Sequence, residues 1–212
     1  MNNCETLLEP SVQPPLQPLV QPLVLVPGLM CNEVVWAGVM SQLSAIATCQ
    51  VVDHGMASSL PQMASQLLAQ APARFALAGH SMGARVALEV FRQAPERVSR
   101  IALLDTGYLP LATGVAGQSE IAKRQTLLHI ACTQGVRAMA SQWVQGMVHP
   151  DRLTDTALIE AIVAMFERKS AVTFEAQIQA LLTRPDARPV LQSLKVPTLI
   201  ACGDQDLWAP LP

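Results

Sequence analysis

Five consecutive residues, Gly79-His80-Ser81-Met82-Gly83, match the pattern G-x-S-x-G, in which a serine can act as a nucleophile. A serine hydroxyl is a weak nucleophile, so it must be held where a base can reach it. A sharp turn from a strand into a helix exposes the hydroxyl in this way. Such a turn leaves no room for side chains two residues before and after the serine, and glycine at 79 and 83 meets that requirement.

The residues on either side of the motif predict the strand and the helix that this turn would join. Residues 75–78 are a short apolar run, and Met82–Gln93 is rich in small and apolar residues and stops before Pro95. The first turn of a helix carries unpaired N–H groups and a partial positive charge. We therefore expect the N–H of Met82 to stabilise the oxyanion that forms when Ser81 attacks a carbonyl group.

A second oxyanion donor is expected from the loop after the first apolar strand. That strand is predicted at 23–26, and Pro27 and Gly28 end it. The N–H of Leu29 is the preferred donor, and Met30 is the neighbour to consider. Gly28 favours this arrangement because a residue without a side chain lets the backbone approach the serine closely.

Apolar runs and helical patterns alternate along most of the chain. The apolar runs lie at 23–26, 50–53, 75–78, 101–104 and 196–202. This alternation predicts an α/β fold with a mostly parallel sheet and helices on both of its faces. Only helical patterns occur between about 110 and 185, so a helical insertion is expected there, and either Thr154 or Asp155 could cap one of its helices.

These patterns divide the chain into three parts. Residues 1–22 are proline-rich and are expected to form an extended, poorly ordered tail. Residues 23–109 and 186–212 are expected to form the α/β core, and 110–185 a helical cap.

Composition excludes several classes of function. The net charge is -2 and the 14 lysines and arginines are scattered, which argues against a nucleic-acid partner. No apolar run approaches the roughly 18 residues of a membrane-spanning helix. The 5 cysteines are widely spaced and include no C-x-x-C pair, which favours reduced thiols and a cytoplasmic location. No histidine pair has the spacing of a zinc protease, so neither a metal nor a cofactor is expected.

Taken in order, these motifs resemble the α/β-hydrolase family, in particular its small esterases, lactonases and C–C hydrolases with a helical cap. The resemblance covers roughly residues 20 to 208 and rests on 27–29, Trp36, 79–83, 95–98 and 197–206. It implies Ser81 as the nucleophile and Asp206 as the acid of the catalytic triad, with Asp204 and Asp105 as alternatives. Family members often carry histidine where this chain has Pro27.

The base of the triad is the point at which the sequence departs from the family. The family order is serine, acid, histidine, and no histidine follows Asp206 in the 212 residues. We therefore expect the last strand and helix to be missing, as in a truncated reading frame or fragment. The four histidines present are His54, His80, His129 and His149. Of these, His54 is the least improbable substitute, and the ring of His80 should point away from the serine hydroxyl.

The resemblance implies a serine hydrolase that forms an acyl-enzyme on Ser81. The helical insertion supplies apolar side chains (Met139, Trp143, Met147 and Phe166), which favour a small, largely apolar ester, thioester or lactone as the substrate. Two alternatives stay open. One is C–C bond hydrolysis on the same fold, and the other is a catalytically inactive remnant that lacks its histidine.

Overall fold

The computed structural model describes residues 21–206. Nearly all of the segment predicted as a tail therefore lies outside the described residues. Its last two residues already belong to the first strand, which begins at Gln21 rather than at residue 23.

The described chain contains a five-stranded sheet in which every neighbouring pair is parallel. The strand order is β2-β1-β3-β4-β5. The strands are β1 (Gln21–Val26), β2 (Ala47–Val51), β3 (Phe75–His80), β4 (Val98–Leu104) and β5 (Thr198–Ala201). The predicted α/β class with a parallel sheet is confirmed. All five strands were predicted, and β2 is displaced the most because it begins three residues and ends two residues before the predicted run.

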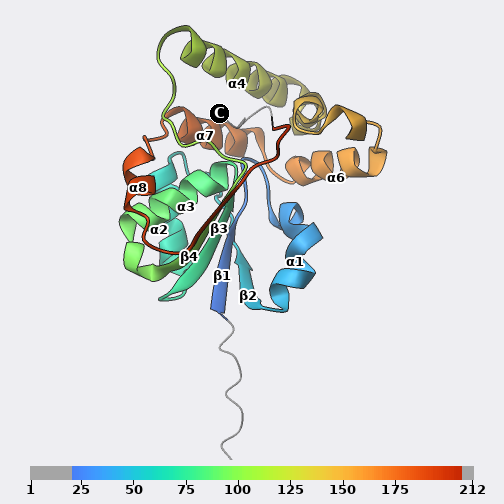
Figure 1. Cartoon of the computed structure of the whole chain (residues 1–212). Helices are drawn as coiled ribbons and strands as arrows, with labels where there is room; N and C mark the ends of the chain where they lie inside the picture. Colours follow the sequence, from blue (N-terminus) through green and yellow to red (C-terminus); the bar gives the residue numbers. More distant parts are fainter. Residues whose placement is uncertain (1–20, 207–212) are drawn as a thin grey trace, which may run out of the picture.

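Helices cover both faces of the sheet (Figure 1). Helix α1 (Ala37–Ser44) lies on one face, where Leu25, Trp36 and Ala78 form a small buried cluster. Helices α2 (Leu60–Gln70), α3 (Met82–Gln93) and α8 (Arg188–Ser193) lie on the other face, over the larger core. Successive residues of a strand point to opposite faces, so a strand covered on both sides must be apolar throughout, as the end of β1 is.

Four helices lie beyond the end of the sheet at which the strands finish (Figure 1). They are α4 (Gly114–Gln134), α5 (Val136–Trp143), α6 (Thr156–Glu167) and α7 (Ala171–Leu182). Gly135 separates α4 from α5 with a φ of +92°, a conformation that glycine adopts without strain. The side chain of Asp155 accepts a hydrogen bond from the N–H of Leu158, so Asp155, and not Thr154, caps α6.

Aromatic contacts join the last three of these helices. The ring of Trp143 lies 5.3 Å from that of Phe166 and 5.5 Å from that of Phe174, measured between ring centres. All three side chains are buried. Burial of large aromatic rings contributes strongly to packing, so this cluster fixes α5, α6 and α7 as one layer.

Strand β5 lies at the edge of the sheet and pairs with β4 alone among the described residues. Its apolar side chains Leu199 and Ile200 are 57% and 68% exposed. Within residues 21–206, β5 is therefore an edge strand with exposed apolar side chains. None of the helices within 21–206 is both long and apolar enough to cross a bilayer.

Candidate active site

Ser81 occupies the turn between β3 and α3 and has a strained backbone conformation. Its φ is +55° and its ψ is -119°, a combination that residues with a side chain rarely adopt. Two hydrogen bonds from β4 and the loop after it hold the serine backbone. The N–H of Ser81 donates to the carbonyl of Leu104 (2.8 Å), and the hydroxyl of Thr106 donates to the carbonyl of Ser81 (2.9 Å).

The two glycines of the motif are required by close backbone contacts. A Cβ added to Gly79 would lie 2.5 Å from the Cα of Ala84 and closer still to the carbonyl oxygen of Gly83. A Cβ added to Gly83 would lie 2.5 Å from the carbonyl oxygen of Pro27 and closer still to that of Val26. Both distances are far inside van der Waals contact, so the start of α3 packs directly on the end of β1.

The loop after β1 lies against the same turn. A Cβ on Gly28 would be 3.3 Å from the Cβ of Ser81 and 3.2 Å from Nδ1 of His80. Met30 has a φ of +61°, and its N–H donates to Oε1 of Gln177 at 2.9 Å. That bond leaves the N–H of Met30 unavailable to a substrate. Within residues 21–206, the N–H groups of Leu29 and Met82 have no protein acceptor.

Two of the three candidate acids lie together at the ends of neighbouring strands. Asp105, with a φ of +48°, follows β4, and Oδ1 accepts from the N–H of Gly203 at 3.0 Å. Carboxylate oxygens of Asp105 and Asp206 and the sulfur of Cys202 all lie within 4.8 Å of one another. Asp204 is exposed. Burial, followed by the charges of Asp206 and Asp105, raises the pKa of the Cys202 thiol, and a protonated thiol is a poor metal ligand.

A cavity of about 310 Å³ opens beside Ser81. Its walls come from α3, the loop after β4, α4 and the end of α7. Asp105 and Thr106 line it together with Ser81, and so do several charged side chains. A larger cleft of about 490 Å³ lies at the other end of α3, around Phe91 and Val190. Ser81 and the candidate acids do not line that cleft, so the cavity beside Ser81 is the candidate site.

Comparison with known proteins identifies the family of the chain. No family model matches the chain. It is 30% identical over 201 residues to a pimeloyl-[acyl-carrier protein] methyl ester esterase of Edwardsiella ictaluri, which covers 88% of this chain and 76% of that protein. The chain belongs to the α/β-hydrolase family. A protein of the same name from Nitrosomonas europaea is 26% identical, over 88% of this chain and 78% of its own length.

A solved α/β-hydrolase structure shows the same fold. The enol-lactonase of Burkholderia xenovorans superposes with a TM-score of 0.77 at 20% identity, over 90% of this chain and 75% of that one. At this identity the likeness establishes the fold and leaves the chemistry to be argued from the site.

Among the described residues of this α/β-hydrolase, 21–206, none of the four histidines lines the cavity. His54 is buried, and its Nε2 lies 2.9 Å from the carbonyl oxygen of Pro27. Nδ1 of His80 is buried without a hydrogen-bond partner among the described residues. Burial holds the pKa of His80 below its usual value, although Asp105 and Asp206 act in the opposite direction. His129 and His149 are exposed.

The apolar side chains expected to line the site lie elsewhere. Met139, Trp143 and Phe166 are buried in the core between the helices, and Met147 is 40% exposed. None of them is among the residues around the cavity. The prediction of an apolar lining is therefore corrected. The residues that sequence reasoning missed are Gln177 and the charged side chains of the cavity, because no local pattern links them to Ser81.

Proposed function

We propose that the chain is a serine hydrolase that cleaves a small ester, thioester or lactone through an acyl-enzyme on Ser81. The observation that carries the proposal is the strained backbone of Ser81 at a cavity, with Gly28 of the loop after β1 packed against it. The N–H groups of Leu29, in that loop, and of Met82 have no acceptor within residues 21–206. Strain of this kind persists in a protein only where the surrounding structure imposes it, and it is concentrated at functional sites.

The proposed reaction begins when Oγ of Ser81 attacks the carbonyl carbon of the substrate and the carbonyl π electrons move to its oxygen. The N–H groups of Leu29 and Met82 donate to that oxyanion, and loss of one such donor typically lowers the rate about 10²–10³-fold. The base of the triad takes the proton of the Ser81 hydroxyl during this attack. The bond from the carbonyl carbon to the leaving oxygen or sulfur then breaks as the carbonyl re-forms, and the base passes that proton to the alcohol or thiol, which in a lactone stays attached to the acyl chain. Water then attacks the acyl-enzyme in the same way, which releases the acid and restores Ser81.

We propose Asp206 as the acid of the triad, the residue that orients the catalytic histidine in other α/β-hydrolases. No histidine follows Asp206 in the 212 residues, so the base of the triad is not assigned. Asp105 is the alternative acid, since it lies beside Asp206 and lines the cavity with Ser81. Asp204 is less suitable because it is exposed. The buried bond of His54 to the loop after β1 argues against it as the base.

The remaining features fit an intracellular enzyme with a covered site. We propose that residues 110–185, which hold α4 to α7, form the cap, and that 23–109 and 186–212 form the catalytic core. Two curated relatives are named as esterases, which supports a carboxylic-ester substrate here. The free cysteines Cys31, Cys49, Cys132 and Cys202 of the described residues support a cytoplasmic location.

A fluorophosphonate probe tests the nucleophile. The probe should label the wild-type chain on Ser81, as located by peptide mass spectrometry, and Ser81→Ala should remove the label. Ser119→Ala is the matched control because Ser119 lines the same cavity and should leave labelling unchanged. Since no histidine lines the cavity in the described residues, the assay is run with and without imidazole as a soluble base.

Equal labelling of wild type and Ser81→Ala would refute the proposal, and so would the absence of labelling under both conditions. An inactive remnant would give the latter result. Turnover of p-nitrophenyl esters and lactones, compared with vinylogous diketones, would then separate ester hydrolysis from C–C bond hydrolysis.

A further inference from the structure

The walls of the cavity beside Ser81 carry more positive than negative charge. Among the described residues that line it, the acids are Asp105 and Glu120, and the basic residues are Arg85, Lys123, Arg124 and Arg184. Four cations therefore face two carboxylates. A cavity with surplus charge of one sign attracts ligands of the other sign.

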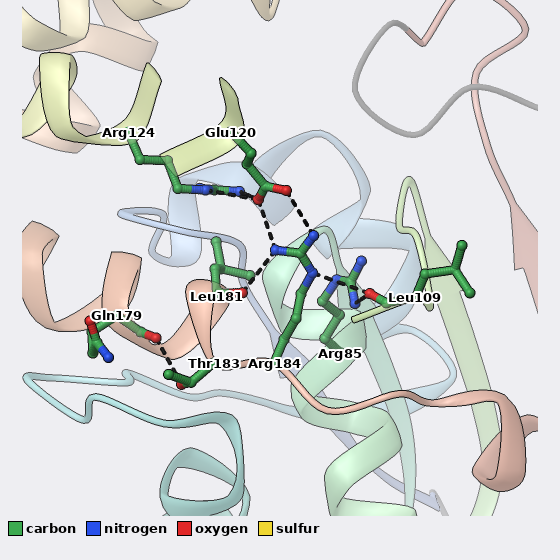
Figure 2. A network of polar contacts seen from close by, with 8 residues as sticks. All are labelled: Arg85, Leu109, Glu120, Arg124, Gln179, Leu181, Thr183 and Arg184. Carbon is green, nitrogen blue, oxygen red and sulfur yellow. Dashed lines mark hydrogen bonds and ion pairs between the residues drawn. The ribbon is translucent and has the colours of Figure 1, made fainter. Parts of the chain in front are cut away.

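Glu120 alone provides the carboxylate for two of the arginines (Figure 2). Its Oε1 lies 2.8 Å from Arg124 and 2.8 Å from Arg184. The side chains of Arg184 and Arg124 are only 9% and 15% exposed. Charges withheld from water in this way need compensation, and one carboxylate balances only one of the two guanidinium groups.

Arg85 has no carboxylate partner among residues 21–206. Its Nη1 donates to the carbonyl of Leu109 at 3.0 Å, and Nε of Arg184 donates to the same oxygen at 3.2 Å (Figure 2). Two like charges are thus held at a single neutral acceptor. Burial, and then the charge of Arg184, lowers the pKa of Arg85 to about 10. The arrangement is the one expected when a third, negatively charged group completes the site.

We propose that this cavity binds an ionised carboxylate of the substrate, so that the ester or lactone opened at Ser81 carries a second, negatively charged group. The inference rests on the proposed function in taking Ser81 as the reacting residue. The planar fork of a guanidinium group matches both oxygens of a carboxylate, and Arg85 is the arginine left to provide it.

The volume of the cavity indicates the size of the part of the substrate that it can hold. If each non-hydrogen atom takes roughly the ~30 Å³ of a water molecule, about 310 Å³ holds about ten of them. Monomethyl glutarate is a molecule of that size with an ester at one end and a carboxylate at the other. Methyl 5-methylhexanoate has the same shape but replaces the carboxylate with an uncharged isopropyl group.

Calorimetric titration of these two esters tests the proposal. It is carried out on Ser81→Ala protein, so that no turnover disturbs the measurement. We expect the charged ester to bind at least about 10-fold more tightly than the neutral one, and Arg85→Gln to weaken its binding about 10- to 100-fold. Arg168→Gln is the matched control, because Arg168 is an exposed arginine that contacts Glu33 away from the cavity, and it should change binding less than about twofold.

Equal affinity for the two esters, or unchanged binding in Arg85→Gln, would overturn the inference. If Arg85→Gln fails to fold by circular dichroism, two other measurements replace it. Arg85→Lys keeps the charge without the fork and should show an intermediate loss. Added salt should weaken the binding of the charged ester only. This titration does not require a reactive Ser81. Loss of the preference for the charged ester can therefore occur while fluorophosphonate still labels Ser81, and labelling can be absent while the preference is present, so the two proposals are tested separately.

Further ligands identify where the negative group sits. Binding of 3-acetoxypropanoate, lost in Arg85→Gln, would place the carboxylate in the alcohol half, whereas binding of monomethyl glutarate alone would place it in the acyl half. Both results support the inference. Inorganic phosphate that binds more tightly than either carboxylate would contradict it and point to a phosphorylated ligand.

Discussion

Replacement of Gly83 by alanine sets two opposing effects against each other, and the structure decides which prevails. Gly83 lies in the first turn of α3 and has no positive φ. Judged by helix propensity alone, alanine should stabilise this position by about 1 kcal/mol. The added methyl group would, however, lie 2.5 Å from the carbonyl oxygen of Pro27 and closer still to that of Val26.

The clash is with backbone, so it cannot be relieved by a side-chain rotation. Real Cβ atoms stay at least 3.0 Å from such atoms, and α3 must therefore move away from β1. Overpacking costs about 1–3 kcal/mol and occasionally more. A clash with two backbone oxygens belongs in the upper part of that range, about 2–3 kcal/mol. After the gain in helix propensity is subtracted, Gly83→Ala should lower the free energy of unfolding by about 1–2 kcal/mol. For a chain of this length, that corresponds to a fall in Tm of roughly 2–8 °C.

The measurement is urea unfolding followed by circular dichroism and tryptophan fluorescence. Gly38→Ala is the matched control, because Gly38 lies in α1 and an added Cβ would meet nothing within 4 Å. That variant should be more stable than wild type by about 0.5–1 kcal/mol. If Gly83→Ala proves as stable as Gly38→Ala, the close contact between α3 and β1 is not present in solution, and the constraint on the Ser81 turn disappears with it.

Three further predictions concern buried polar groups. Gln177 is 1% exposed, and Gln177→Leu removes the hydrogen-bond partners of the N–H of Met30 and of the carbonyl of Gly55. Urea unfolding should show a loss of about 1–3 kcal/mol for each of these two backbone groups. Burial lowers the pKa of His54 from 6.5, so below pH 6.5 the unfolded chain binds a proton that the folded chain does not. The free energy of unfolding should therefore decrease by up to about 1.4 kcal/mol for each pH unit below 6.5, and this decrease should be smaller in His54→Gln, as measured by urea unfolding at several pH values. Burial raises the pKa of Cys31 to about 12, so iodoacetamide at neutral pH should modify exposed Cys132 and leave Cys31 intact, as read by mass spectrometry.

The parts of the fold that could be predicted are those with local causes. Helix α3 spans Met82–Gln93, as expected, because a strained turn begins it and Pro95 follows it. The side chain of Ser59 accepts from the N–H of Gln62, so a residue next to the first turn of α2 caps that helix. Strand β2 was misplaced because it is only partly buried and its apolar signal is weak. Its position is set by pairing with β1, which lies more than twenty residues away.

Contacts between distant segments explain what was missed at the site. The N–H of Met30 could not be separated from that of Leu29 as an oxyanion donor from sequence, because the group that occupies it, Gln177, lies 147 residues further along the chain. The same holds for the two acids. The proximity of Asp105 and Asp206 follows from the pairing of β4 with β5, and nothing in either local sequence indicates it.

The polar character of the cavity reflects which side chains the helices beyond the sheet bury and which they leave at the cavity. The apolar side chains of α5, α6 and α7, among them Trp143, Phe166 and Phe174, are used to pack those helices against one another. Along the 21 residues of α4, only Gly117 and Ala131 are fully buried, and Leu127, Leu128 and Ile130 pack against the core while partly buried. Five residues of α4 line the cavity, and four of them are polar: Ser119, Glu120, Lys123 and Arg124. Helix α4 thus supplies three of the six charged side chains of the cavity beside Ser81. The others come from α3, from the loop after β4 and from the residues after α7, so the charge of the cavity arises only when these distant segments meet.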